Sequence, residues 1–159
     1  MSEVTGQLLA ALRPQFDTEI AVGDWLTIDQ ARIDAFAAAT GDSQWIHVDP
    51  ERARRESPYG TTVAHGFLTL ALLPFLTGSN SPDYLCRHFP GMRLRVNYGL
   101  NRLRFPAPVR CGARIRARTV LRGAVLLDKG LEVTYVFTVE IEGYDKPALV
   151  AEQVVRVYP

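Results

Sequence analysis

The chain has 159 residues, 47% of them apolar, with charges of both signs, as is typical of one globular domain. Its two cysteines, Cys86 and Cys111, lie outside any CxxC or cysteine–histidine spacing, which argues against a disulfide framework or a structural zinc. The sequence has no apolar run near the roughly 20 residues of a membrane helix and no signal-peptide pattern at its start. We therefore expect a cytoplasmic protein, with residues 1–159 forming a single domain.

Charge is distributed unevenly along the chain. The net charge is +1, yet the segment between Tyr84 and Leu127 holds ten arginines and no acidic residue, while the remainder holds eight basic and 17 acidic residues. Arginine makes forked contacts with phosphate and carboxylate groups. The segregation indicates an anionic ligand or an acidic partner surface, and we expect neither nucleic acid nor a membrane as partner.

The first half of the chain predicts helices. Residues 4–13 are amphipathic and should form a helix that ends before Pro14, so that residues 1–14 form an N-terminal helical cover. Residues 19–28 suit a short strand pair or an extended entry segment. Asp29 can cap a helix that runs to Thr40 and stops at Gly41. Residues 42–49 carry no helical period, and Asp49-Pro50 should begin a short charged helix to Glu56.

The most apolar segment, Ala64 to Leu76, predicts a helix enclosed by a sheet or by a second subunit, because its apolar residues lie on nearly all sides. Pro74 should kink or end this helix. From Met92 the apolar residues alternate with polar ones, which predicts four long antiparallel strands separated by turns at residues 127–130 and 143–146. The pattern is that of an α+β fold in which an antiparallel sheet wraps around a central apolar helix.

Asp42 and His47 form the first candidate site. They are five residues apart in a segment free to fold back after the Gly41 stop, so both side chains can reach one water molecule. Histidine exchanges protons near neutral pH, and a carboxylate can orient or accept a second proton. Taken alone, an aspartate after a helix-ending glycine is more often a cap or turn residue, and a single histidine is more often structural.

Gly66 is the second candidate. It precedes the apolar helix in the run Thr62 to Phe67, so its backbone N–H is placed at a helix start where donors are unpaired. Such a donor can stabilise a developing oxyanion. The alternative is that glycine is needed there only for close packing of the helix start.

Three runs of sequence carry a resemblance to a known family. TGDSQWIHVDPERA is followed by VAHGFLTLALLP and then by NYGLNRLRFPAPV. Together they resemble the MaoC-like dehydratases, also called hydratase-2 or R-specific enoyl-CoA hydratases, and especially the nodulation N-like branch. The resemblance covers about residues 15–157 and implies a single hot-dog fold.

The resemblance also implies an activity: (R)-specific addition of water to a trans-2-enoyl-CoA, giving (3R)-3-hydroxyacyl-CoA. Asp42 and His47 would hold the water, and the N–H of Gly66 would bind the thioester oxygen. No metal or redox cofactor is implied, and coenzyme A enters only as part of the substrate. The site residues that we expect to contact the substrate are Gln44, Trp45, His65, Phe67 and Arg104.

Two positions depart from the family pattern. Gln44-Trp45 stands where an Asn-Pro pair is common, so Gln44 would replace the orienting amide and Trp45 would line the acyl pocket. Ala71 stands where many members carry a hydroxyl residue, which puts substrate geometry in doubt. His65 is interpreted as a structural or lining residue, and His88 as part of an exposed loop.

The arginines offer a site for the phosphates of coenzyme A. The alternating ones equally fit the solvated face of a sheet; they are Arg93, Arg95, Arg114, Arg116 and Arg118. Arg104, beside the prolines that end its strand, is the best single candidate. Two alternatives to hydration remain. One is acyl-CoA hydrolysis, which the lack of a carboxylate on the central helix disfavours; the other is a non-catalytic hot-dog protein that binds acyl-CoA or supports a partner. An open sheet edge and the apolar helix predict a homodimer.

Overall fold

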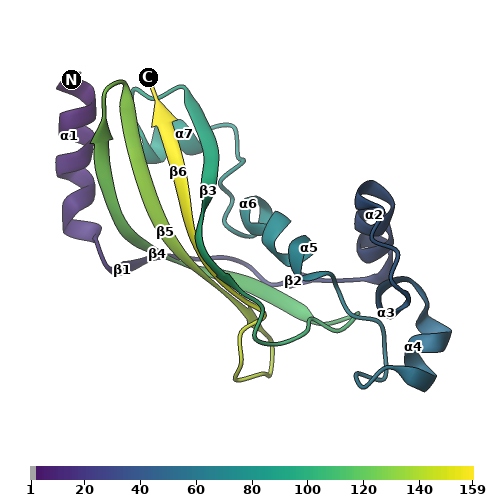
Figure 1. Ribbon diagram of the computed structural model, residues 1–159. Coiled ribbons are helices and arrows are strands. Elements are labelled where there is room, and N and C mark those ends of the chain that lie inside the picture. Colours follow the sequence, from purple (N-terminus) through teal and green to yellow (C-terminus); the bar gives the residue numbers. More distant parts are fainter. Residues whose placement is uncertain (1–2) are drawn as a thin grey trace.

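Four long strands in the second half of the chain form the framework of the molecule (Figure 1). We describe a computed structural model in which residues 3–159 are placed; Met1 and Ser2, the start of the expected helical cover, lie outside the described residues. The strands are β3 (Leu94–Arg104), β4 (Arg114–Leu127), β5 (Gly130–Ile141) and β6 (Leu149–Tyr158). All of their pairings are antiparallel, which confirms the prediction from the period-two pattern.

The sheet has the strand order β1-β4-β5-β6-β3. β1 (Thr18–Val22) and β2 (Leu26–Thr27) both pair with β4, so the expected pair between them is wrong. β1 pairs with β4 through four residue pairs, with a register shift between Glu19 and Ala21, and β2 pairs with β4 through two. At the other edge β3 pairs only with β6 among the described strands, and its second edge is open.

One face of the sheet carries the hydrophobic core. Alternate residues of β5, such as Val133, Tyr135 and Phe137, are buried against the helices, whereas their neighbours point to the other face. This alternation follows from the two-residue period of a strand. Helix α1 (Glu3–Leu12), with a 3-10 turn η1 (Arg13–Gln15) after it, packs on β4 through buried leucines, as the expected cover should.

Three helix boundaries form as predicted, because each has its own capping residue. Asp29 accepts a hydrogen bond from the N–H of Arg32 at 2.9 Å and begins α2 (Gln30–Thr40). Gly41 ends it in the left-handed conformation, with φ of 79°, which glycine adopts without a steric penalty. Asp49 caps α4 (Pro50–Glu56) in the same way as Asp29 caps α2.

The central helix is interrupted near Pro74, as predicted, but it is less enclosed than its apolar sequence suggested. It begins at Gly66 and is divided into α5 (Gly66–Ala71) and α6 (Leu73–Leu76), since Pro74 lacks the N–H that would continue the ladder. It is also not enclosed on all sides, because Phe67 and Phe75 are more than 60% exposed. Within residues 3–159, no helix combines the length and apolar composition needed to cross a membrane.

Two short helices were not predicted. Residues 42–49, expected to be free of helix, contain the single turn α3 (Trp45–Val48). The segment that holds His88 was expected to be a loop, yet residues 84–88 form α7 (Tyr84–His88). One turn of helix is too short for a 3.6-residue period to be visible in the sequence.

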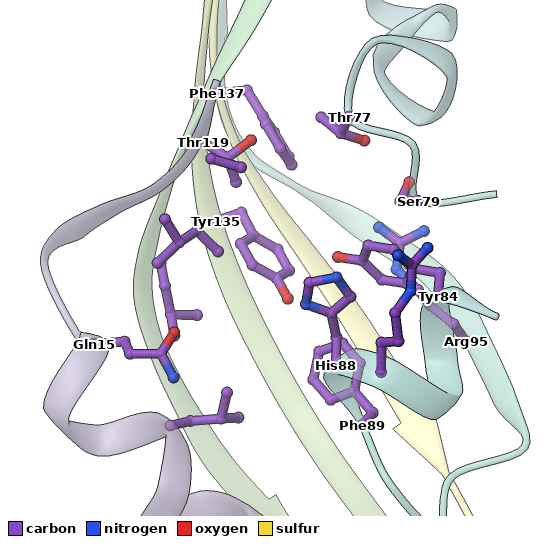
Figure 2. Close-up of a pocket in the computed structure, with 15 residues that line it drawn as sticks. Gln15, Thr77, Ser79, Tyr84, His88, Phe89, Arg95, Thr119, Tyr135 and Phe137 are labelled. Carbon is purple, nitrogen blue, oxygen red and sulfur yellow. The ribbon is translucent and has the colours of Figure 1, made fainter. Parts of the chain in front are cut away.

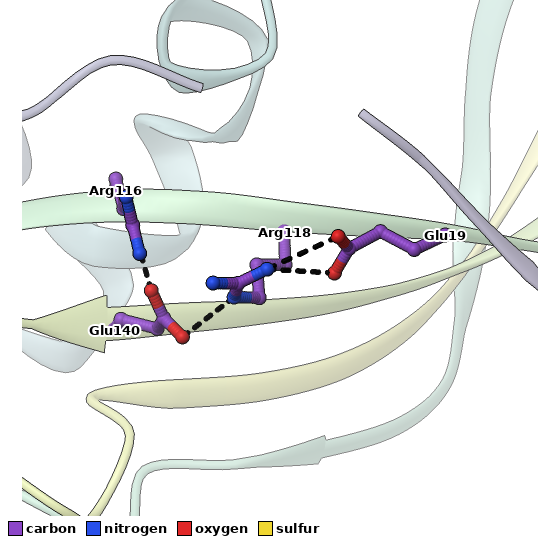
Figure 3. Close-up of polar contacts among 4 residues, drawn as sticks. All are labelled: Glu19, Arg116, Arg118 and Glu140. Carbon is purple, nitrogen blue, oxygen red and sulfur yellow. Dashed lines mark hydrogen bonds and ion pairs between the residues drawn. The ribbon is translucent and has the colours of Figure 1, made fainter. Parts of the chain in front are cut away.

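The outer face of the sheet carries a ladder of ion pairs (Figure 3). Glu140 on β5 binds Arg116 at 2.7 Å and Arg118 at 2.6 Å, and Arg118 also reaches Glu19 of β1 at 3.0 Å. Arg114 pairs with Glu142 at 2.9 Å. The charge segregation along the sequence is therefore partly neutralised in the fold, and three of the alternating arginines do not form a free phosphate site.

The ladder should make stability depend on pH. Hydrogen bonds from Arg118 and then Arg116 lower the pKa of Glu140, so its contribution is present above the ordinary glutamate pKa and is lost as pH falls through the lowered one. Because these pairs are partly exposed, we expect Glu140→Gln to reduce the free energy of unfolding by about 1 kcal/mol or less at pH 7. Urea unfolding at pH 7 and near pH 3.5 should show the difference shrinking with acid; an unchanged difference contradicts this account.

Candidate active site

Asp42 lies directly after the end of α2, in the group of helices α2, α3 and α4 at the opposite end of the molecule from α1 (Figure 1). The left-handed turn at Gly41 redirects the chain, and the N–H of Asp42 is 3.4 Å from the hydroxyl of Thr40. Its side chain is 54% exposed. The carboxylate is therefore accessible to solvent while its backbone is fixed by the helix end.

His47 is buried on α3 and is held through both its ring and its backbone. Its Nδ1 lies 2.6 Å from the carbonyl oxygen of Val63, and its own carbonyl accepts a hydrogen bond from the Gln30 amide at 2.7 Å. A carbonyl can only accept, so Nδ1 must carry the proton. In the neutral ring Nε2 is consequently the atom with a free lone pair, as a general base requires.

His65 contacts His47 directly. The two imidazoles stack with ring centroids 3.8 Å apart and an angle of 25° between their planes, and Phe36 lies against His65 with centroids 5.0 Å apart. His65 is 2% exposed, and its Nε2 donates to the carbonyl oxygen of Asp42 at 2.9 Å. His65 thus joins the two predicted catalytic residues, a more central place than a lining role suggested.

Asp42, His47 and His65 bring three potential ligand atoms together, all within 4.8 Å of one another. Two hydrogen bonds of about 2.8 Å each can span such a distance through a single water molecule. The same donor set is chemically able to hold a divalent metal ion. However, His47 Nδ1 and His65 Nε2 are already bound to carbonyl oxygens, which leaves one nitrogen of each ring.

Gly66 is the first residue of α5, immediately after His65. Within residues 3–159 its N–H has no hydrogen-bond acceptor. A Cβ at this position would lie 2.9 Å from the ring of Phe105, so close packing also requires the glycine. Both interpretations of Gly66 therefore have support, and they do not exclude each other.

The predicted substrate contacts are only partly gathered here. Trp45 is half-buried on α3 with the Arg52 guanidinium 4.4 Å from its ring centroid. Gln44 precedes it, and within the described residues its side chain makes no hydrogen bond; its carbonyl accepts from the N–H of His47. The amide of Gln44 therefore does not take over an orienting contact in this structure.

Phe67 and Arg104 lie near Gly66 on the surface. The Phe67 ring meets Phe105 edge-on, with centroids 5.7 Å apart. Arg104 precedes Phe105 and forms a hydrogen bond only to the carbonyl of Leu103 among the described residues, so its guanidinium is available to an anion. Arg95, by contrast, is turned into a cavity at the far end of the central helices.

Two supporting residues were not predicted. Gln30 accepts a hydrogen bond from the Thr62 hydroxyl while donating to the His47 carbonyl, and thus joins α2, α3 and the strand-like segment before α5. Gln30 and Thr62 are 32 positions apart in the sequence. No spacing in the sequence indicates such a contact.

Comparison with known proteins decides the family. The protein-family model described as a MaoC-like domain matches residues 13–141. This chain belongs to the MaoC-like family. It is 48% identical over 153 residues to the Mycobacterium tuberculosis protein 3-hydroxyacyl-thioester dehydratase Z, covering 96% of this chain and 97% of that one.

One further relative and one solved structure are similar to this MaoC-like protein. Nodulation protein N of Rhizobium leguminosarum bv. viciae is 46% identical over 148 residues, 90% of this chain and 86% of the relative. The solved (R)-hydratase from A. caviae, described as involved in PHA biosynthesis, superimposes with a TM-score of 0.64 and 26% identity over 88% of this chain and 98% of that one. The expected family and hot-dog fold are confirmed.

Proposed function

We propose that this MaoC-like protein catalyses the reversible hydration of trans-2-enoyl-CoA to (3R)-3-hydroxyacyl-CoA. The observation that carries the proposal is the convergence of Asp42 with the buried His47, close enough for one water molecule to bridge them. Relatives named as a dehydratase and an (R)-hydratase support the same reaction class. The chemistry requires no metal and no redox cofactor, and we place the protein in the cytoplasm.

The mechanism follows from the donors and acceptors of the site. A water molecule between Asp42 and His47 directs one hydrogen to the carboxylate and one to the free lone pair of Nε2, so that an oxygen lone pair faces the substrate. As the C3–O bond forms, the pair accepts one proton from the water. The protonated pair then delivers that proton to C2, so that the elements of water are added across the double bond.

Attack at C3 moves an electron pair onto the thioester oxygen, which becomes an enolate. We assign the N–H of Gly66 as the donor to that oxygen, because it has no other acceptor within the described residues. A donor fixed in advance is most effective where charge develops during the reaction. Arg104 is then the proposed contact for a phosphate of coenzyme A, and Trp45 and Phe67 are proposed acyl contacts.

His65 acts in this scheme as a positioning residue. It stacks on the His47 ring and binds the backbone of Asp42, so it fixes the separation of the pair. Its remaining ring nitrogen, Nδ1, is buried without a partner within the described residues. Because Nε2 donates to the Asp42 carbonyl, Nδ1 of the neutral ring is an acceptor, and a hydrogen-bond donor such as the bound water is the group that would satisfy it.

The test is an assay of the purified protein with crotonyl-CoA. Hydration removes the conjugated double bond, so the absorbance of the enoyl thioester should fall without release of free thiol. Thiol release from saturated acyl-CoA would instead indicate a thioesterase, which the absence of an acidic residue from residues 64–76 disfavours. Binding of the thioester with neither reaction would favour a non-catalytic acyl-CoA protein.

We also propose that the protein is a homodimer. The open edge strand β3 exposes a series of apolar side chains. The central helices also expose Phe67, which contacts Phe105 just after β3, and Phe75, which lies by the segment between β1 and β2. The exposed residues of the strand are Leu94, Val96, Tyr98 and Leu100. An open apolar edge of this kind is normally covered by a partner.

Light scattering at micromolar concentration should therefore give about twice the 17.7 kDa of one chain. Val96→Glu should shift the mass towards the monomer, because it places a charge in the apolar edge. Val125→Glu is the matched control, since Val125 is exposed on β4, which two strands separate from β3 in the sheet. A monomeric wild type, or equal effects of both variants, contradicts the proposal.

A further inference from the structure

A second cavity lies away from Asp42 and His47, between α1, β1, α7 and the core face of the sheet (Figure 2). Its volume is about 200 Å³, room for about six water molecules at roughly 30 Å³ each. It reaches Thr77, just beyond the end of α6. From Gly66 to Leu76 the central helices rise roughly 15 Å, and no residue of the proposed active site lines the cavity.

The lining of this cavity is cationic. Arg87 and Arg95 contribute positive charge, and the lining contains no aspartate or glutamate. Burial and then the nearby Arg87 lower the pKa of His88, which favours its neutral ring. Arg87 is already paired with Asp83 at 2.9 Å. Arg95 is different: within residues 3–159 it makes no hydrogen bond or ion pair, and its Nε is buried without a partner. Its guanidinium is 5.8 Å from the ring centroid of Tyr84.

A buried donor without an acceptor costs free energy, and a buried charge without a counter-charge costs more. The guanidinium fork matches a carboxylate, which can accept two of its N–H groups at once. An anion at Arg95 would therefore remove an unfavourable feature of the free protein. The cavity lining contains no acidic side chain that could pair with Arg95 in place of a ligand.

The surroundings of Arg95 define the rest of the ligand. Figure 2 shows Tyr84, Tyr135 and His88 turned towards the same space. Burial raises the pKa of Tyr135 well above its ordinary range, so its hydroxyl keeps its proton and can donate. Leu121 and Phe137 add apolar surface to the same lining, which favours a ligand with a hydrocarbon body over an inorganic anion.

We propose that this cavity binds a small organic carboxylate, with its carboxylate group on Arg95 and its hydrocarbon body against Leu121 and Phe137. The volume suits a ligand of the size of hexanoate. The site is separate from the proposed hydratase site, and the proposal does not depend on that activity. Arg95, one of the arginines considered for coenzyme A, then serves a different anion.

The test is calorimetric titration of the whole protein with hexanoate, with hexanamide as the uncharged control. We expect hexanoate to bind at one site and hexanamide to bind at least about tenfold more weakly. Arg95→Gln should weaken hexanoate binding at least about tenfold. Arg93→Gln is the matched control: Arg93 directly precedes β3, is exposed and lies outside the cavity lining, so the change should alter binding less than about twofold.

Circular dichroism melting shows whether Arg95→Gln is folded. If it is not, Tyr135→Phe replaces it: this variant keeps the ring and removes only the hydroxyl, and it should weaken hexanoate binding by about threefold or more. Equal binding of hexanamide, equal or tighter binding of inorganic phosphate, or full affinity in a folded Arg95→Gln variant would overturn the proposal. So would a wild-type protein that does not bind millimolar hexanoate.

Discussion

His47→Ala should reduce the rate of crotonyl-CoA hydration by about 10²–10⁴-fold, the range typical of losing a general acid–base group. The reason is the position of Nε2. Nδ1 is occupied by the Val63 carbonyl at 2.6 Å, so Nε2 is the only ring nitrogen that can accept a proton from the water. The measurement is kcat for crotonyl-CoA under steady-state conditions, compared with wild type.

The control must separate chemistry from folding, because His47 is buried and its removal leaves the Val63 carbonyl without this bond. That loss should cost about 1–3 kcal/mol of stability. Asp42→Asn is the second variant, because the Asp42 side chain is 54% exposed and its loss leaves the core intact. His88→Ala is the matched control outside the proposed site. Full activity of a folded Asp42→Asn or His47→Ala variant contradicts the mechanism.

Gly66→Pro should lower kcat by about 10²–10³-fold, the usual effect of removing one oxyanion donor. Proline removes the N–H that is proposed to bind the enolate oxygen. The backbone tolerates the change, since Gly66 is the first residue of its helix and His65 before it is extended, with φ of −60° and ψ of 138°. Helix formation should therefore survive.

Gly66→Ala is the matched control for this variant. Alanine introduces the same Cβ, which would meet Phe105 at 2.9 Å, but it keeps the N–H. The difference in kcat between the two variants isolates the hydrogen-bond donor from the steric effect. If alanine and proline reduce kcat equally, Gly66 serves packing alone and the enolate must be bound by another group.

The elements that could be predicted from the sequence are those whose causes are local. Asp29 and Gly41 end α2 through their own capping group and backbone conformation. The long strands follow from alternation over many residues, which only one face of a sheet can bury. Proximity of Asp42 to His47 was predictable because only five residues separate them.

Contacts between distant segments could not be predicted. Arg118 meets Glu19 only because β1 pairs with β4, a contact between residues 99 positions apart. The stacking of His65 on His47 depends on the position of α3, whose single turn leaves no periodic signal. The inward direction of Arg95 likewise depends on the sheet register, which pairs it with the buried Val157 of β6.

The most direct test of the proposed reaction is the identity of the product formed from crotonyl-CoA in water labelled with heavy oxygen. The proposed mechanism predicts (3R)-3-hydroxybutyryl-CoA with one labelled oxygen at C3, formed by the wild type and not by folded His47→Ala. Free coenzyme A with labelled crotonate, the (3S) product, or unchanged crotonyl-CoA would contradict it.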